Sequence, residues 1–99
     1  MHVLALRVEL HLPDIRSLKA KRSVIKPIVE GARHRYRVAS AETAHQNSWQ
    51  RAELGFVAVG GSPHHVTEII DEVERYVWSF PEAQVIASFR GWLEEDDDT

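Results

Sequence analysis

The sequence predicts an α+β domain, because segments that alternate with a period of two are interleaved with segments of helical period. Alternation over residues 2–12 and 51–60 indicates two half-buried strands, and another follows over residues 83–93. With a short polar strand over residues 38–44, the element order is β-α-β-β-α-β. Right-handed connections around one core leave few arrangements of this order. The commonest is the ferredoxin-like sandwich, a four-stranded antiparallel sheet with two helices on one face.

The alternation also predicts which side chains point towards the helices. In the first and third strands these are Leu4, Leu6, Val8, Leu10, Leu12, Ala52, Leu54, Phe56 and Ala58. In the last strand we expect Val85, Ala87, Phe89 and Leu93 to point inward. The side chains expected to be nearly fully buried are Leu6, Val8, Leu10, Leu54, Phe56, Ile28, Val29, Ile70 and Val73.

Each helix has a recognisable start. Ser17 is a suitable N-cap for a first helix over residues 18–36, whose apolar residues recur every three or four positions. Pro27 lies inside this helix, so either one helix bends there or residues 17–22 form a separate turn. We favour one bent helix. Ser62 and Pro63 begin the second helix as its cap and first residue.

Length and composition are those of one globular domain. The domain is expected to cover residues 1–93, and residues 94–99, which include five consecutive acids, are expected to form a disordered acidic tail. The chain has no cysteine and no apolar run close to the roughly 18 residues that a membrane span requires. It also lacks the features of a signal peptide, so we expect a cytoplasmic protein without a membrane partner.

Charge is divided unequally along the chain. Residues 1–37 hold nine basic and three acidic residues, a net charge of +6, whereas residues 38–99 hold three basic and twelve acidic residues, a net charge of −9. A molecule of this kind does not bind nucleic acid over its whole surface, but one basic face can bind phosphate locally.

The basic residues of the first helix are spaced so that they share one face. We call this set the basic ridge, and it consists of Lys19, Arg22, Lys26, Arg33 and Arg37, interrupted only by Glu30. Two interpretations remain open. The ridge binds the phosphates of a partner, or it is a solvated face that is attracted to the acidic half of the same molecule.

The loop over residues 45–50 is the second candidate binding element. Trp49 is either an exposed stacking group or, as we favour, a side chain packed over the sheet edge. Arg51 follows directly and is a candidate nucleic-acid contact, although Gln50, Arg51 and Glu53 are equally suited to cross-strand pairs on the open sheet face.

Sequence signatures of catalysis, metals and cofactors are missing. No two of the six histidines have the i, i+4 spacing of a helical metal site, and Gly60-Gly61-Ser62 lacks the lysine and spacing of a phosphate loop. We therefore expect no metal, no cofactor and no enzymatic activity. Residues 54–59 are superficially similar to the third strand of RNA-recognition domains. No aromatic residue is expected on the open sheet face, so base stacking there is rejected.

Four segments together resemble a known family. They are residues 8–13 (VELHLP), 17–23 (SLKAKRS), 41–42 (AE) and 49–55 (WQRAELG), and they are similar to the YlxP-like family of small bacterial proteins, a domain of unknown function. The resemblance implies a ferredoxin-like fold. It also implies a gene often found beside those for initiation factor two and ribosome-binding factor A, and hence a link to ribosome assembly or translation.

This chain departs from the family pattern at two positions. Members often have an acid where Ala20 stands, which would complete a capping box with Ser17, and another at the position of Ala44. The expected function is a non-catalytic binding module that contacts ribosomal RNA or a ribosome-associated protein through the basic ridge and the neighbouring loop. The alternative is a protein–protein adaptor or homodimer that uses the open sheet face or an edge strand.

Overall fold

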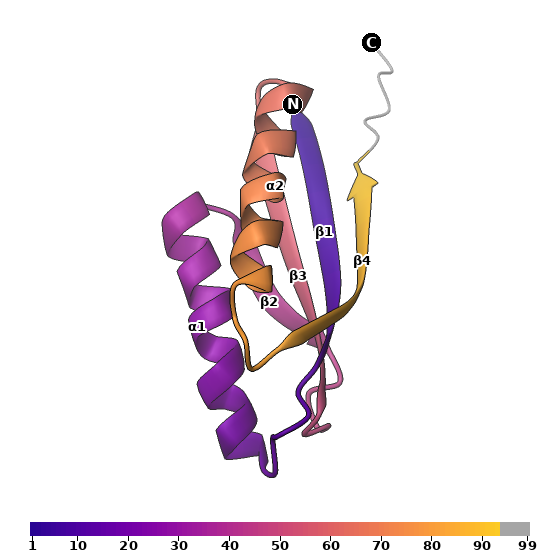
Figure 1. Cartoon of the computed structure of the whole chain (residues 1–99). Coiled ribbons are helices and arrows are strands. Elements are labelled where there is room, and N and C mark those ends of the chain that lie inside the picture. Colours follow the sequence, from indigo (N-terminus) through magenta and orange to yellow (C-terminus); the bar gives the residue numbers. More distant parts are fainter. Residues whose placement is uncertain (94–99) are drawn as a thin grey trace.

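The computed structural model describes residues 1–93, which form one sheet covered on one face by two helices (Figure 1). The elements are β1 (His2–His11), α1 (Leu18–Tyr36), β2 (Ala39–Ala44), β3 (Arg51–Gly60), α2 (Pro63–Trp78) and β4 (Gln84–Trp92). The strand order is β2-β3-β1-β4 and every pair is antiparallel, which confirms the ferredoxin-like prediction. The expected acidic tail, residues 94–99, lies outside the described residues. Within residues 1–93, neither helix has the length and apolar character required to cross a membrane.

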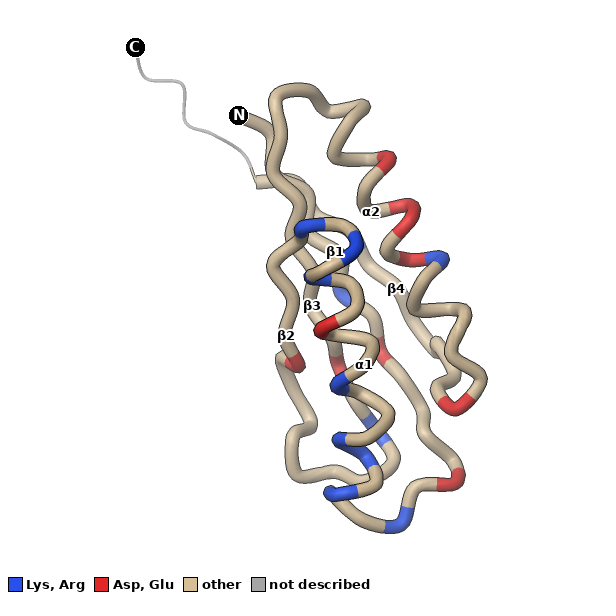
Figure 2. The backbone as a smooth tube through the Cα atoms, turned by 90° about the vertical axis from the view of Figure 1, so that its left-hand side faces the viewer, with Lys and Arg blue, Asp and Glu red and all other residues tan. Residues whose placement is uncertain are grey.

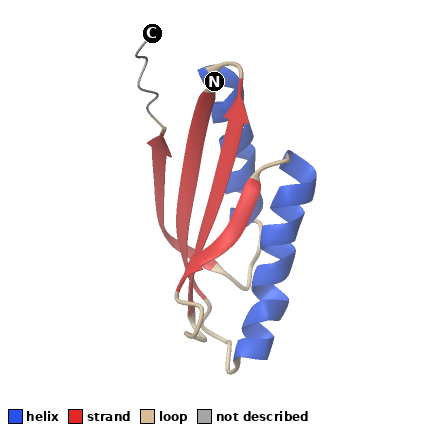
Figure 3. Ribbon diagram, turned by 180° about the vertical axis from the view of Figure 1, so that it is seen from behind, coloured by secondary structure: helices blue, strands red, loops and turns tan. Residues whose placement is uncertain are grey.

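The central strands have the register that the sequence predicts. Leu6 lies opposite Phe56, and Val8 lies opposite Leu54, so the large side chains of β1 and β3 share the face beneath the helices. All nine residues expected in the core are buried, and Leu54 and Phe56 have no exposed surface. The other face of these strands carries no helix (Figure 3).

One continuous helix, α1, begins at Leu18, so the alternative of a separate turn over residues 17–22 is wrong. Ser17 caps it, because the hydroxyl of Ser17 accepts a hydrogen bond of 3.0 Å from the backbone N–H of Ala20. Pro27 lies within the helix, on its exposed side. The helix ends where Arg37 adopts a left-handed conformation, with φ of 55°, and its N–H bonds to the carbonyl of Arg33.

The two helices approach closely at Gly31. A Cβ atom at this position would lie 1.8 Å from the hydroxyl oxygen of Tyr76, so no larger residue fits without movement. The Tyr76 hydroxyl instead donates a hydrogen bond of 3.2 Å to the carbonyl of Pro27. Its ring packs edge-on against Tyr36 and Phe80, with centroid distances of 5.7 and 5.0 Å. This contact fixes α1 beside α2.

The predicted orientation of β4 is wrong over most of the strand. Val85 lies opposite Leu10 and points inward as expected, but Ala87 lies opposite Glu9 and Phe89 opposite Arg7, both on the open face. The register shifts between Glu9 and Leu10, which leaves one extra residue in β4. A β-bulge of this kind reverses the faces of all residues beyond it.

Candidate functional site

The basic ridge lies along the exposed side of α1. All five of its members, Lys19, Arg22, Lys26, Arg33 and Arg37, have exposed side chains. Figure 2 shows the lysines and arginines of α1 in blue beside the mainly acidic α2, so opposite charges are segregated onto neighbouring helices. Four of the five residues therefore lie on α1 as predicted, whereas Arg37 is the C-cap that follows the helix.

The charges of the ridge have no acidic partner among residues 1–93. None of its five members lies within 4.0 Å of a described carboxylate, although six other ion-pair contacts are formed. Only Arg33 has a described side-chain hydrogen bond, which it donates to the carbonyl of Ser40 at 2.8 Å. Within residues 1–93, no carboxylate therefore competes with a partner for these cations.

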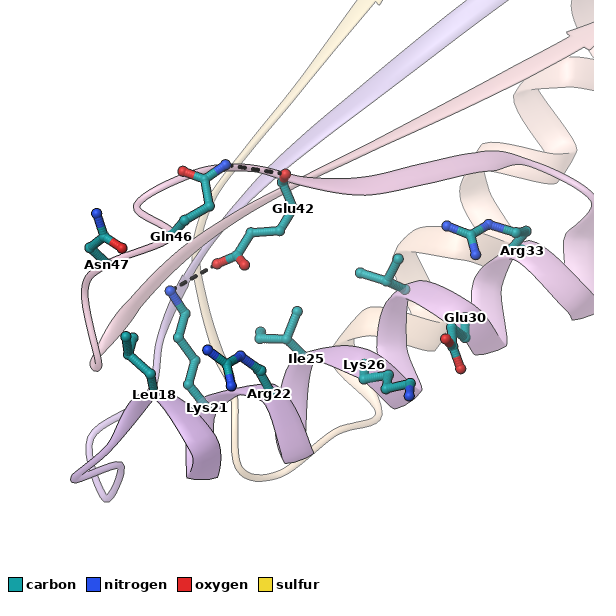
Figure 4. A pocket seen from close by; sticks show the side chains of 11 residues that line it. Leu18, Lys21, Arg22, Ile25, Lys26, Glu30, Arg33, Glu42, Gln46 and Asn47 are labelled. Carbon is teal, nitrogen blue, oxygen red and sulfur yellow. Dashed lines mark hydrogen bonds and ion pairs between the residues drawn. The ribbon is translucent and has the colours of Figure 1, made fainter.

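A groove of about 470 Å³ lies between α1 and β2 (Figure 4). Ridge residues Arg22, Lys26 and Arg33 line it, and the other lining residues are Leu18, Lys21, Ile25, Val29, Glu30, Glu42, Gln46 and Asn47. Its volume falls within the range of small-ligand pockets. Most members of the ridge thus border a concave surface.

Lys21 is the residue of this site that sequence reasoning missed. Its side chain is only 3% exposed, and its ammonium lies 2.8 Å from Oε2 of Glu42, a side chain that is 24% exposed. The same ammonium donates a hydrogen bond of 2.7 Å to the carbonyl of His45. The signal was present in the sequence, because Lys21 precedes Ile25 by four positions and Ile28 by seven, which places it on the apolar stripe.

Strand register explains why Glu42 faces Lys21. Glu42 lies opposite the buried Leu54, so it points to the helix side of the sheet. Apart from the Lys21 ammonium, no described donor reaches Glu42 Oε2, which is shielded from solvent. The pair is therefore a structural connection between α1 and β2, in which the Lys21 ammonium donates a hydrogen bond to His45 and forms an ion pair with Glu42.

The loop between β2 and β3 adjoins the first turns of α1. Gln46 and Asn47 line the groove together with Leu18, and the Gln50 amide donates to the carbonyls of Pro13 and Ile15, at 3.3 and 3.2 Å. Trp49 is 50% exposed, so the favoured prediction of a packed side chain is wrong. Trp49 is therefore a half-exposed side chain in the loop that adjoins the first turns of α1.

Arg51 lies on the opposite face of the molecule from the ridge. It is exposed on the open sheet face, where its guanidinium is 3.9 Å from a carboxylate oxygen of Glu9. Arg7 lies 3.7 Å from Glu53 in a second pair on the same face. The cross-strand alternative describes Arg51 correctly, and the structure does not bring it together with the other candidate residues.

The open face also carries an aromatic residue, contrary to the prediction. The bulge in β4 places Phe89 there, and the guanidinium carbon of Arg7 lies 4.4 Å from the centroid of its ring. Among the described residues of the open face, this single ring is already covered by a cation. It does not form the row of aromatic side chains on which RNA-recognition domains stack bases.

Comparison with known sequences establishes the family. The model of a family described as "Protein of unknown function (DUF503)" matches residues 3–90. This chain belongs to the DUF503 family. It is also 32% identical over 80 residues to "Uncharacterized protein YlxP" of Bacillus subtilis (strain 168), covering 81% of this chain and 87% of that protein. The resemblance drawn from the sequence motifs is thereby confirmed, and the whole groove lies within the DUF503 region.

Proposed function

We propose that this DUF503 protein is a non-catalytic module whose basic ridge binds the phosphate backbone of RNA, with ribosomal RNA as its partner. The observation that carries the proposal is the row of five exposed cations without a described carboxylate partner. Like charges on one helix face repel one another, and phosphate groups relieve that repulsion.

The dimensions of the ridge favour a polyanion over a single anion. The helix rises about 21 Å between Lys19 and Arg33, at roughly 1.5 Å per residue, and Arg37 lies just beyond its last residue. Three of the five cations border the groove. A phosphate backbone of RNA that follows the groove would meet these positive charges on the α1 side. Backbone contacts position a nucleic acid without reading its bases, and double-stranded RNA is recognised largely in this way.

Two further features support RNA as the partner. The half-exposed Trp49 provides one stacking surface in the loop that adjoins the first turns of α1. The resemblance to the YlxP-like family implies a gene beside those for initiation factor two and ribosome-binding factor A, which is why ribosomal RNA is named.

The test is salt-dependent binding to a ribosomal RNA fragment, measured by fluorescence anisotropy. Five phosphate contacts predict a slope of about −3.5 to −4.5 in log K against log salt concentration. Reversing Lys19, Arg22, Arg33 and Arg37 to Glu should weaken binding and flatten the slope, by about one unit for each lost contact. The melting temperature should change little, because exposed charges contribute little to stability.

A matched pair of single variants separates the ridge from overall charge. Arg22→Glu and Arg75→Glu change the net charge equally, and both side chains are exposed, but Arg75 lies on α2. The proposal predicts weaker binding for Arg22→Glu alone. Equal effects of the two variants, or wild-type protein that shows no salt-sensitive association with RNA, would contradict it.

Trp49→Ala tests the loop separately. A stacking role predicts a loss of about 1–3 kcal/mol in binding free energy. Because Trp49 is only half-buried, the melting temperature should fall less than for a core tryptophan, and binding is compared at a temperature where both proteins are folded. Unchanged binding would restrict the proposed interface to α1.

A further inference from the structure

The two edges of the sheet differ in length and in chemistry. β2 has six residues, ASAETA, none of which has a large apolar side chain, and α1 packs along it. β4 has nine residues and forms the other edge of the sheet, as Figure 3 shows. Polar contacts reach β4 from α2 at Ser88 and Arg90.

The β4 edge carries a concentration of exposed apolar side chains. Ile86, Phe89, Trp92 and Leu93 are between 48% and 59% exposed. Trp78, on α2, adds a fifth beside Arg90, with which it lines a shallow depression. Soluble proteins protect such edges with lysine, proline or short strands, because free edges pair with other strands. β4 contains neither lysine nor proline, and its bulge lies near its first residues.

We propose that β4 is the interface of a homodimer, in which two copies of β4 pair antiparallel about a two-fold axis. An axis near Phe89 would place Phe89 against its own copy and Trp92 opposite Ile86 of the second copy. The large apolar side chains within β4 would then all meet apolar partners. The two sheets would join into one of eight strands.

Charge at this edge does not oppose pairing with a second copy of the same chain. Arg90 is the only charged residue of β4, and its guanidinium lies 2.8 Å from both Asp71 and Glu74 of the same molecule. Burial disfavours the charged form of Arg90, but hydrogen bonds to Glu74 and Asp71 outweigh this and raise its pKa above the ordinary value. The cation is therefore neutralised internally, and two identical strands meet without repulsion between like charges.

The available area is compatible with a stable dimer. Aromatic side chains bury about 150–250 Å² each, so a half-exposed Phe or Trp has roughly 100 Å² left to bury. Phe89 and Trp92 together supply about a quarter of the roughly 800 Å² per partner that is typical of specific interfaces. The half-exposed Ile86 and Leu93, the free backbone edge of β4 and the exposed Trp78 add further area.

The test is the mass of the full chain in solution, measured by sedimentation equilibrium over a range of concentrations. The expected mass is twice the 11.3 kDa of one chain. Ile86→Lys and Trp92→Lys should raise the dissociation constant at least tenfold. Val59→Lys is the matched control, because Val59 is 60% exposed but lies on β3, away from the β4 edge. It should leave the dimer intact.

Hydrogen exchange on the wild-type protein gives an answer that does not depend on how the variants fold. Outward-facing amides of β4 should become protected as concentration rises, and those of β2 should not. A monomer at ~100 µM, a concentration at which micromolar interfaces are occupied, would overturn the proposal. So would a dimer that only Val59→Lys dissociates, because the interface would then be the open face. These results are independent of RNA binding, which the proposed function places on α1.

Discussion

The ammonium of Lys21 lies 2.8 Å from Oε2 of Glu42, and this ion pair joins the beginning of α1 to the edge strand β2. The two side chains also form one end of the groove, between the ridge and the loop that carries Trp49. The position of the candidate RNA-binding helix on the sheet therefore depends on a buried charge.

Lys21→Met should lower the free energy of unfolding by about 1–3 kcal/mol. Removing one partner of a buried pair typically costs about 3–5 kcal/mol, and the partial exposure of Glu42 reduces this. The measurement is urea denaturation followed by circular dichroism. Lys19→Met, at an exposed position of the same helix, is the control and should change stability by less than about 0.5 kcal/mol. Equal losses in both variants would show that the pair contributes nothing specific.

Gly31→Ala should destabilise the protein although alanine favours helices. The added methyl group would overlap the Tyr76 hydroxyl, and overpacking of this kind costs about 1–3 kcal/mol, against a gain of about 0.5–1 kcal/mol from helix propensity. Thermal unfolding checks the sign. In a Tyr76→Ala background the same substitution should become stabilising, because the obstructing ring is gone. A stabilising effect in the wild type would contradict the observed packing.

Ala20→Glu should raise the free energy of unfolding by about 0.3–1.5 kcal/mol. Ala20 already donates its backbone N–H to Ser17, and a glutamate here would reach back to the N–H of Ser17 and complete a capping box. The gain should be smaller in a Ser17→Ala background, which a double-mutant cycle in urea would measure. An equal gain in both backgrounds would indicate an electrostatic effect alone.

Gln50→Glu should destabilise the protein by about 1–3 kcal/mol, because a carboxylate would replace the amide that donates to the carbonyls of Pro13 and Ile15. The comparison is Asn47→Asp, which makes the same chemical change at an exposed position of the same loop. Chemical denaturation of both variants distinguishes the hydrogen bonds from the added charge.

The element order and most of the core could be predicted from the sequence, because β1, β3 and α2 keep their periods without interruption. The register of β4 could not. One extra residue in β4 makes a bulge opposite Glu9 and Leu10. The alternation of apolar and polar residues along one strand does not reveal where its pairing register with the neighbouring strand shifts. Phe89 was therefore assigned to the wrong face.

The candidate site was predicted in part. The spacing of the ridge places its residues on the side of α1 opposite the apolar stripe. Because the apolar stripe packs on the sheet, the exposure of the ridge could be predicted from the sequence. Lys21 was overlooked because lysine is usually exposed, and its burial depends on Glu42, a residue 21 positions away that the strand pairing brings to it. Arg51 was grouped with Trp49 because they are close in sequence, yet the strand directs its side chain to the other face.

The strand order β2-β3-β1-β4 places α1 at the sheet edge farthest from β4. In an assembly paired through β4, the two β2 strands would be seven strand spacings apart, about 34 Å at roughly 4.8 Å per strand, with both helices on the same side. Such a particle would be bivalent. An RNA long enough to reach both helices would be held with an avidity that neither helix provides alone, whereas a short fragment would measure only the affinity of one.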